Sequence, residues 1–147
     1  MYGFSIQLEL PFESAITKVT EALKKEGFGV LTDIDVKATL KAKLNIELRP
    51  YRILGACNPQ FAHSAIEADP DIGLLLPCNV VVREEADASI TIAFMDPTAV
   101  LQLVDKPEVD AIGKEVLLLL QKVCATLKVE NEQLPASIAE ACVASSS

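Results

Sequence analysis

Two short segments place a cysteine and an asparagine beside a proline, and they are the strongest candidates for a functional site. Residues 55–59 read Gly-Ala-Cys-Asn-Pro, and residues 76–79 read Leu-Pro-Cys-Asn. Cys57 precedes a predicted helix, whose dipole and free N–H groups favour the thiolate form of a cysteine at that position. An asparagine amide supplies both a hydrogen-bond donor and an acceptor. This pattern suits a nucleophile, a redox thiol or an anion-binding pocket.

These segments define a set of candidate ligand-binding residues, to which the single histidine of the chain is added. The set is Cys57, Asn58, Pro59, His63, Pro77, Cys78 and Asn79. His63 follows Cys57 by six residues, about 9 Å along a helix, so we expect no direct contact between them. A purely structural interpretation stays open, because free cysteine often packs as a small hydrophobic residue and Asn-Pro often only starts a helix.

Several familiar chemistries are excluded by the residues present. The six glycines form neither a dinucleotide-binding nor a phosphate-loop motif, and one histidine cannot supply H-E-x-x-H. No serine lies in a G-x-S-x-G segment. The four cysteines contain no C-x-x-C pair, match no zinc-finger spacing and are too few for a disulfide scaffold. We therefore expect reduced thiols and no metal site within one chain, and the sequence identifies no cofactor.

Composition predicts a small acidic globular domain. The chain has 147 residues, a net charge of −8 and a hydrophobic content of 50%, which are typical of one folded domain. The acidic balance argues against a nucleic-acid or membrane-surface partner, because both are polyanions. The N-terminus lacks the basic and apolar regions of a signal peptide, and no apolar run approaches the ~20 residues of a membrane span. We therefore expect a cytoplasmic protein.

Charge is distributed unevenly along the chain. Residues 1–66 carry 8 basic and 7 acidic side chains, whereas residues 67–147 carry 5 basic and 14 acidic ones. Residues 36–52 form a basic island, which contains one acidic residue, Glu47, and five basic residues: Lys37, Lys41, Lys43, Arg49 and Arg52. A solvated helix face explains this island. The functional alternatives are an anion-binding patch or one half of a self-complementary dimer.

Hydrophobic spacing predicts an α+β fold in the order β-α-β-α-β-α-β-β-α. Period-2 alternation and apolar runs predict five strands, at residues 4–10, 28–34, 51–57, 78–84 and 89–94. Helical spacing predicts helices at residues 13–26, 36–44, 58–68 and 107–127, with a short helical turn at 96–104. Asp35 is the expected N-cap of the second helix, and Gly27 is expected to end the first. We expect a mixed, mainly antiparallel sheet with helices on one face.

The last predicted helix and the tail bear on domain organisation. Apolar residues cover most of the circumference of the 107–127 helix, so it is buried either in the core or, as we favour, against a partner chain. Residues 1–127 are expected to form a single α+β domain. Residues 128–147 are expected to form a C-terminal tail, in which 134–143 could make an extra helix.

Residues 51–59 and 68–82, which contain both cysteine segments, resemble the bacterial and archaeal domain-of-unknown-function family numbered 302. The Gly-Phe-Gly turn at 27–29 and residues 34–44 are also similar to that family, and the likeness covers about residues 1–127. The resemblance implies a curved antiparallel sheet wrapped on a long helix, similar to TATA-box-binding-protein-like folds. It also implies a homodimer and a cytoplasmic setting. It implies no activity, and a fold shared with a DNA-binding saddle is no reason to expect DNA binding.

Three hypotheses about function follow. The first is a dimeric module that binds a small ligand, a cofactor or an anion in a pocket near Cys57 and Cys78. The second is a thiol or redox enzyme that uses Cys57, with Cys78 as the resolving partner. The third is a structural dimer without a site. In the two dimer hypotheses the partner is a second copy of the chain, contacted through the 107–127 helix or through the sheet. Taken together, the motifs favour a protein that is not an enzyme.

Overall fold

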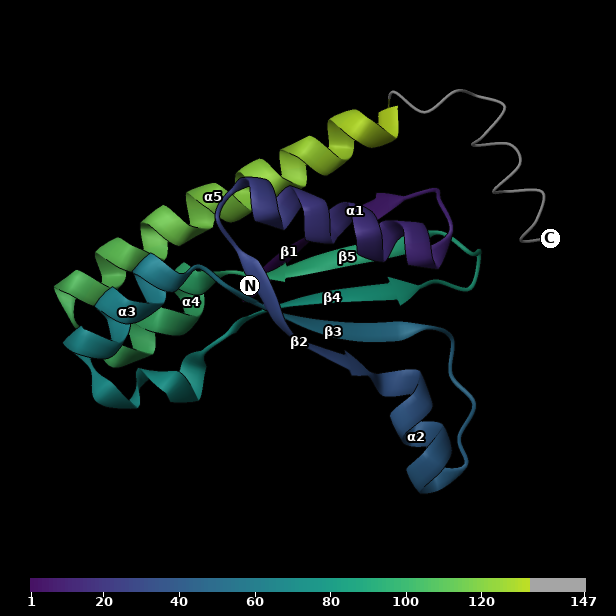
Figure 1. Ribbon diagram of the computed structural model, residues 1–147, viewed down its shortest axis with the longest axis horizontal. Helices are drawn as coiled ribbons and strands as arrows, with labels where there is room; N and C mark the ends of the chain where they lie inside the picture. Colours follow the sequence, from purple (N-terminus) through teal and green to yellow (C-terminus); the bar gives the residue numbers. More distant parts are fainter. Residues whose placement is uncertain (133–147) are drawn as a thin grey trace.

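A computed structural model describes residues 1–132, and the expected order of elements is confirmed (Figure 1). The strands are β1 (Gly3–Leu8), β2 (Gly29–Asp35), β3 (Tyr51–Cys57), β4 (Cys78–Glu84) and β5 (Ile90–Met95). The α-helices are α1 (Phe12–Lys25), α2 (Val36–Leu44), α3 (Pro59–Ala68), α4 (Pro97–Leu101) and α5 (Pro107–Glu132). Two 3₁₀ helices complete the chain, η1 (Pro70–Leu75) and η2 (Gln102–Val104). The predicted helix at 134–143 lies outside the described residues, and α5 continues to Glu132, the last described residue and five residues past the expected end.

The five strands form one sheet in the order β1-β5-β4-β3-β2. Each of the four pairings between described strands is antiparallel, so the sheet has no parallel part and is simpler than the mixed sheet expected. β3 is an internal strand, as its apolar residues on both faces predict. β1 and β2 are the two edges. The α+β class is confirmed.

One face of the sheet forms the core with α1 and α5, which lie side by side on it (Figure 1). Strand alternation sends one set of side chains to that face, among them Leu8, Val80 and Phe94, which are almost completely buried. The buried residues of α5 follow a helical spacing of three and four: Val109, Gly113, Val116, Leu120, Val123 and Leu127. Leu118 is 60% exposed, so within one protomer α5 buries a single stripe rather than most of its circumference.

Local signals fix the ends of several helices. The carboxylate of Asp35 accepts a hydrogen bond from the Ala38 N–H at 2.9 Å, so it caps α2 as predicted. Gly27 has a φ of +85°, a left-handed conformation that favours glycine and ends the α1 segment. No described helix combines the length and apolarity required to cross a bilayer.

Residues 36–50 form an arm, which consists of α2 and the loop that follows it. Figure 1 shows α2 projecting at one end of the sheet, with α3 at the opposite end. None of these residues is buried: α2 has no buried position, and Leu44, Ile46 and Leu48 of the arm are all exposed. The arm is therefore an apolar and basic extension that contributes little to the core of its own protomer.

Candidate functional site

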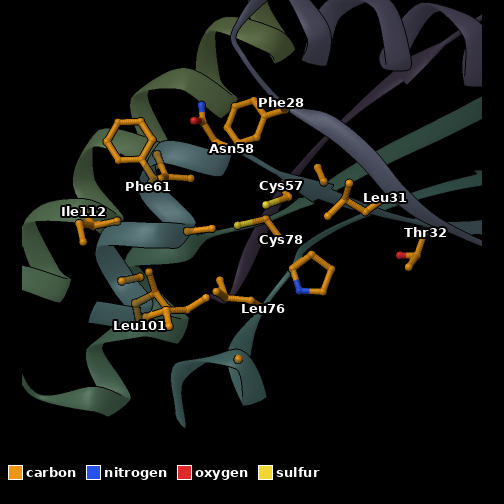
Figure 2. Close-up of a pocket in the computed structure, with 17 residues that line it drawn as sticks. Phe28, Leu31, Thr32, Cys57, Asn58, Phe61, Leu76, Cys78, Leu101 and Ile112 are labelled. Carbon is orange, nitrogen blue, oxygen red and sulfur yellow. The ribbon is translucent and has the colours of Figure 1, made fainter. Parts of the chain in front are cut away.

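A cavity of about 300 Å³ lies where β3 and β4 meet α3 and α5 (Figure 2). Its walls also include residues of β2, η1 and α4. The lining residues are Phe28, Leu31, Thr32, Ala56, Cys57, Asn58, Phe61, Ala62, Ala65, Ile66, Gly73, Leu76, Pro77, Cys78, Leu101, Ile112 and Val116. The lining is almost wholly apolar, and within residues 1–132 it contains no charged side chain.

The sheet register brings the two cysteine segments together at this cavity. Ala56 on β3 pairs with Cys78 on β4, so Cys57 lies one residue along from that pair. Cys57 ends β3 and Cys78 begins β4, which places both at the same end of two neighbouring antiparallel strands. Both are free thiols, Cys57 half-buried and Cys78 buried. Figure 2 shows the two sulfur atoms directed toward the same space.

Asn58 does not use its side chain as the sequence suggests. It occupies the N-cap position of α3, and Pro59 is the first helical residue as predicted, but the amide makes no capping hydrogen bond. Instead the Asn58 Nδ2 donates to the backbone carbonyl of Glu26 at 3.3 Å. A Cβ at Gly27 would lie 3.2 Å from this nitrogen. The amide therefore ties the start of α3 to the turn after α1, beside the cavity.

Gly55 allows the wall of the cavity to close around Pro77. A Cβ at position 55 would meet the side chain of Thr32 and would lie 2.7 Å from the Cγ of Pro77. Contacts this short do not occur between real side chains, so only glycine fits between β2 and the Leu76–Pro77 segment. The peptide bond between Leu76 and Pro77 is cis. The glycine of the first segment and the proline of the second are thus packing partners.

Three of the predicted ligand-binding residues lie outside the cavity lining. Asn79 follows buried Cys78 on β4 and is exposed, because alternate side chains of a strand point to opposite faces. The side chain of His63 is 76% exposed, and its Nε2 lies 3.2 Å from the Oε1 of Glu67 one turn away. Pro59 begins α3 without lining the cavity. Cys57, Asn58, Pro77 and Cys78 are the four predicted residues that line it.

Burial keeps the thiol of Cys78, on the β4 side of the cavity, in its uncharged form. It raises the pKa of the Cys78 thiol to about 11, and the nearby Cys57 adds to this effect. The Cys78 side chain is therefore a protonated thiol at neutral pH, which is a weak hydrogen-bond donor rather than a nucleophile. Cys124 on α5 packs against the core, where burial also raises its pKa. Cys142 lies outside the described residues.

The donor set of the cavity does not fit a metal ion. Across residues 1–132, no group of three or more histidine, cysteine, aspartate or glutamate side chains is close enough to hold one. Two thiols alone cannot complete the four-ligand tetrahedron that zinc prefers.

The apolar lining is the part of the site that motif analysis missed. Phe28, Phe61 and Ile112 come from a turn, α3 and α5, and none belongs to a cysteine segment. Ile66 lines the cavity and is also 47% exposed, because it lies where the cavity opens to solvent. Helical spacing marks such residues as apolar surface but does not show that they surround a space.

The combination of this sheet with two adjoining cysteine segments agrees with one family. The family described as "Domain of unknown function DUF302" matches residues 4–127. The chain belongs to the DUF302 family. Its fold is similar to that of an uncharacterized conserved DUF302 protein from Bacillus stearothermophilus. The crystal structure of that protein and this chain superpose with a TM-score of 0.76, and the match has 28% sequence identity and covers 87% of this chain and 97% of that chain. No curated protein matches this DUF302 chain, and neither likeness names an activity.

Proposed function

We propose that this DUF302 chain is a dimeric ligand-binding module whose cavity beside Cys57 and Cys78 takes a small, uncharged and mainly apolar molecule. The observation that carries the proposal is a space of about 300 Å³ with an apolar lining and two free thiols. Small-molecule sites typically have volumes of roughly 300–1,000 Å³ and apolar walls with a few polar groups. The Cys57 and Cys78 thiols and the Asn58 amide are the polar groups here.

The lining favours a neutral ligand over the anion that the sequence also allows. A buried anion requires a cationic or multiple N–H partner, because the cost of removing a charge from water is large. The lining residues within 1–132 include no lysine, arginine or histidine. The basic residues Lys37, Lys41 and Lys43 lie on α2, at the opposite end of the sheet from α3 (Figure 1). An uncharged ligand avoids that cost.

The dimer is proposed to form through the sheet rather than through α5. The exposed apolar side chains gather on β2 and the arm, where Leu31 and Leu44 are 69% and 62% exposed. On α5 the exposed large apolar side chains are Leu118 and Val129, which are eleven residues apart, and Leu118 lies among charged neighbours such as Glu115 and Lys122. A dimer interface requires a patch of apolar area rather than a single residue. The edge of the sheet at β2 is therefore the better candidate.

A pair of matched fluorescent probes tests the ligand class. N-phenyl-1-naphthylamine is neutral, and 8-anilino-1-naphthalenesulfonate is the same ring system with a sulfonate, and both become brighter in apolar sites. We expect the neutral probe to bind saturably at one site per chain and at least about tenfold more tightly than the sulfonate, because a buried charge costs several kcal/mol. Equal binding of the two probes would contradict the neutral-ligand proposal.

A cavity-filling variant locates the bound probe. Ala62 lines the cavity, so Ala62→Leu should weaken binding of the neutral probe by about tenfold or more. Ser64→Leu adds the same side chain on the exposed side of α3 and should leave binding unchanged. If Ala62→Leu binds as wild type does, the cavity is not the binding site. If wild type binds no probe, and native mass spectrometry finds no co-purifying molecule, a structural dimer without a site is favoured.

A further inference from the structure

The mouth of the cavity is apolar and uncovered within one protomer. Leu31 and Ile66 both line the cavity while being 69% and 47% exposed. Leu74, next to the lining residue Gly73, is 86% exposed. Large apolar side chains grouped at a cavity entrance mark a surface that another molecule covers.

The arm carries a second exposed apolar group, far from the first in the same protomer. Leu44, Ile46 and Leu48 are 62%, 44% and 37% exposed. Strand β2 separates the two surfaces, because Gly29 at its start pairs with Cys57 beside the cavity and Asp35 at its end caps the arm helix. Even Leu31, the mouth residue that lies on β2, is four residue steps from Asp35, about 14 Å at about 3.4 Å per residue. The arm therefore cannot reach the cavity mouth of its own protomer.

A second copy overcomes this separation if the two β2 strands lie side by side. In the described part of the chain β2 has a strand partner on one side only, so its outer N–H and C=O groups are available for pairing. Two identical edge strands pair antiparallel about a twofold axis. This reverses one strand relative to the other. The end of each β2, with its arm, then lies beside the start of the other β2, with its cavity.

Charge on the two surfaces is complementary. Lys37, Lys43 and Arg49 of the arm have no ion-pair partner among the residues that the structure describes. Glu67 on α3 and Asp71 on η1, two elements that line the cavity, are both exposed, and Glu67 also lies within ion-pair distance of His63. Opposite charges around an apolar contact select the partner and its orientation. The arm thus carries apolar side chains that match the apolar mouth, together with charges of the opposite sign.

We infer that two copies of this chain exchange arms, each arm covering the cavity mouth of the other copy. The partner's Leu44, Ile46 and Leu48 complete the apolar wall near Leu31 and Leu74, and its lysines face Glu67 and Asp71. The role of the arm as a cover rests on the proposed ligand-binding function, whereas the contact between copies does not. The site is therefore incomplete in a single protomer.

Charge reversal on the two surfaces tests the contact. The arm variant Lys37→Glu with Lys43→Glu and the mouth variant Glu67→Lys with Asp71→Lys should each be monomeric by light scattering at concentrations where wild type is a dimer. A one-to-one mixture of the two variants should form a heterodimer, because both of its arm–mouth contacts regain opposite charges. Leu118→Glu on α5 should remain dimeric. A monomeric wild type, a mixture without heterodimer, or a monomeric Leu118→Glu would overturn the inference.

Binding of the neutral probe then tests whether the arm covers the cavity, which is a separate question from whether the two copies associate. The monomeric variants should bind N-phenyl-1-naphthylamine at least about fivefold more weakly than wild type, and the heterodimer should recover wild-type affinity. A heterodimer that forms without recovering affinity would show that the arm does not cover the cavity. If the heterodimer forms and no form binds the probe, the proposed function fails while the contact stands.

Discussion

Cys57 and Cys78 lie one register step apart on neighbouring strands, because Cys78 pairs with Ala56. Twenty residues lie between the two cysteines in the sequence, and they include α3 and η1. The antiparallel turn from β3 to β4 brings both thiols back to one end of the sheet, where they line one cavity. This relationship makes the two cysteine segments a single structural unit, whatever its ligand.

Occupation of the cavity should protect Cys57 from alkylation. Cys57 is half-buried and lines the cavity. Cys124 on α5 is also half-buried but does not line the cavity. We expect N-phenyl-1-naphthylamine to slow iodoacetamide modification of Cys57 by about tenfold and leave the rate at Cys124 unchanged. Peptide mass spectrometry measures both rates in one sample. Equal slowing at the two cysteines would indicate a general effect of the probe rather than occupation of the cavity.

The same experiment bears on the thiol-enzyme hypothesis. An enzyme that attacks through Cys57 requires that thiol to be much more reactive than an ordinary surface thiol. Modification of Cys57 at or below the rate of the unfolded chain would exclude this role. Because Cys78 stays protonated at neutral pH, it should be the slower of the two cavity thiols in the folded protein.

Stability should decrease in alkaline solution because of Cys78. Burial raises the pKa of this thiol from 9.0 to about 11, so the folded state holds the proton more tightly than the unfolded chain does. The resulting stabilisation is complete below pH 9 and is lost as pH rises through about 11. Two pKa units correspond to about 3 kcal/mol of unfolding free energy, as an order of magnitude.

Urea unfolding under reducing conditions between pH 8 and pH 11 measures this effect. Cys78→Ala is the control, because it removes the titrating group but keeps the other alkaline groups. The difference in unfolding free energy between wild type and Cys78→Ala should narrow by about 2–3 kcal/mol over that range. A difference that does not change with pH would mean that Cys78 is as accessible to deprotonation in the folded protein as in the unfolded chain.

Much of the fold follows from local sequence signals. Asp35 predicts the start of α2 because a carboxylate there reaches a free N–H, and Gly27 predicts the end of α1 because its conformation is left-handed. The strands follow from alternation, as at β4, where Cys78, Val80 and Val82 are buried. These features depend only on neighbours within a few residues, and those neighbours can be read directly from the sequence.

The cavity could not be predicted in the same way. Phe28, Phe61 and Ile112 each satisfy a local pattern of buried apolar residues, but they leave a space where they meet. A cavity is the difference between the space enclosed by several elements and the volume of the side chains that fill it, and no spacing of residue types encodes it. His63 shows the same dependence on tertiary structure, because it follows Cys57 by only six residues and yet its side chain is 76% exposed and does not line the cavity.

Gly55→Ala should destabilise the protein. Its new methyl group would lie 2.7 Å from the Cγ of Pro77 and would also meet Thr32, so β2 or the Leu76–Pro77 segment must shift. Overpacking of this kind typically costs about 1–3 kcal/mol. Gly29→Ala is the matched control on β2, because its Cβ would have no atom within 4 Å. Thermal unfolding should show a lower midpoint for Gly55→Ala only. A loss of similar size in Gly29→Ala would point to a general effect of β-carbon addition.

The hydrogen bond of Asn58 yields a prediction that separates two roles for this residue. If the amide capped α3, Asn58→Asp would preserve stability, because aspartate is an equally good N-cap. The structure instead shows Nδ2 donating to the Glu26 carbonyl, a role that a carboxylate cannot perform because it only accepts.

We therefore expect Asn58→Asp to lower the unfolding free energy at neutral pH by about 1–3 kcal/mol, at least as much as Asn58→Ala, because it places a negative charge against a carbonyl oxygen. Asn79→Asp, on the exposed face of β4, should change stability by less than about 0.5 kcal/mol. Chemical denaturation of the three variants measures these differences. Wild-type stability in Asn58→Asp would mean that capping, and not the tie to Glu26, is what Asn58 contributes beside the cavity.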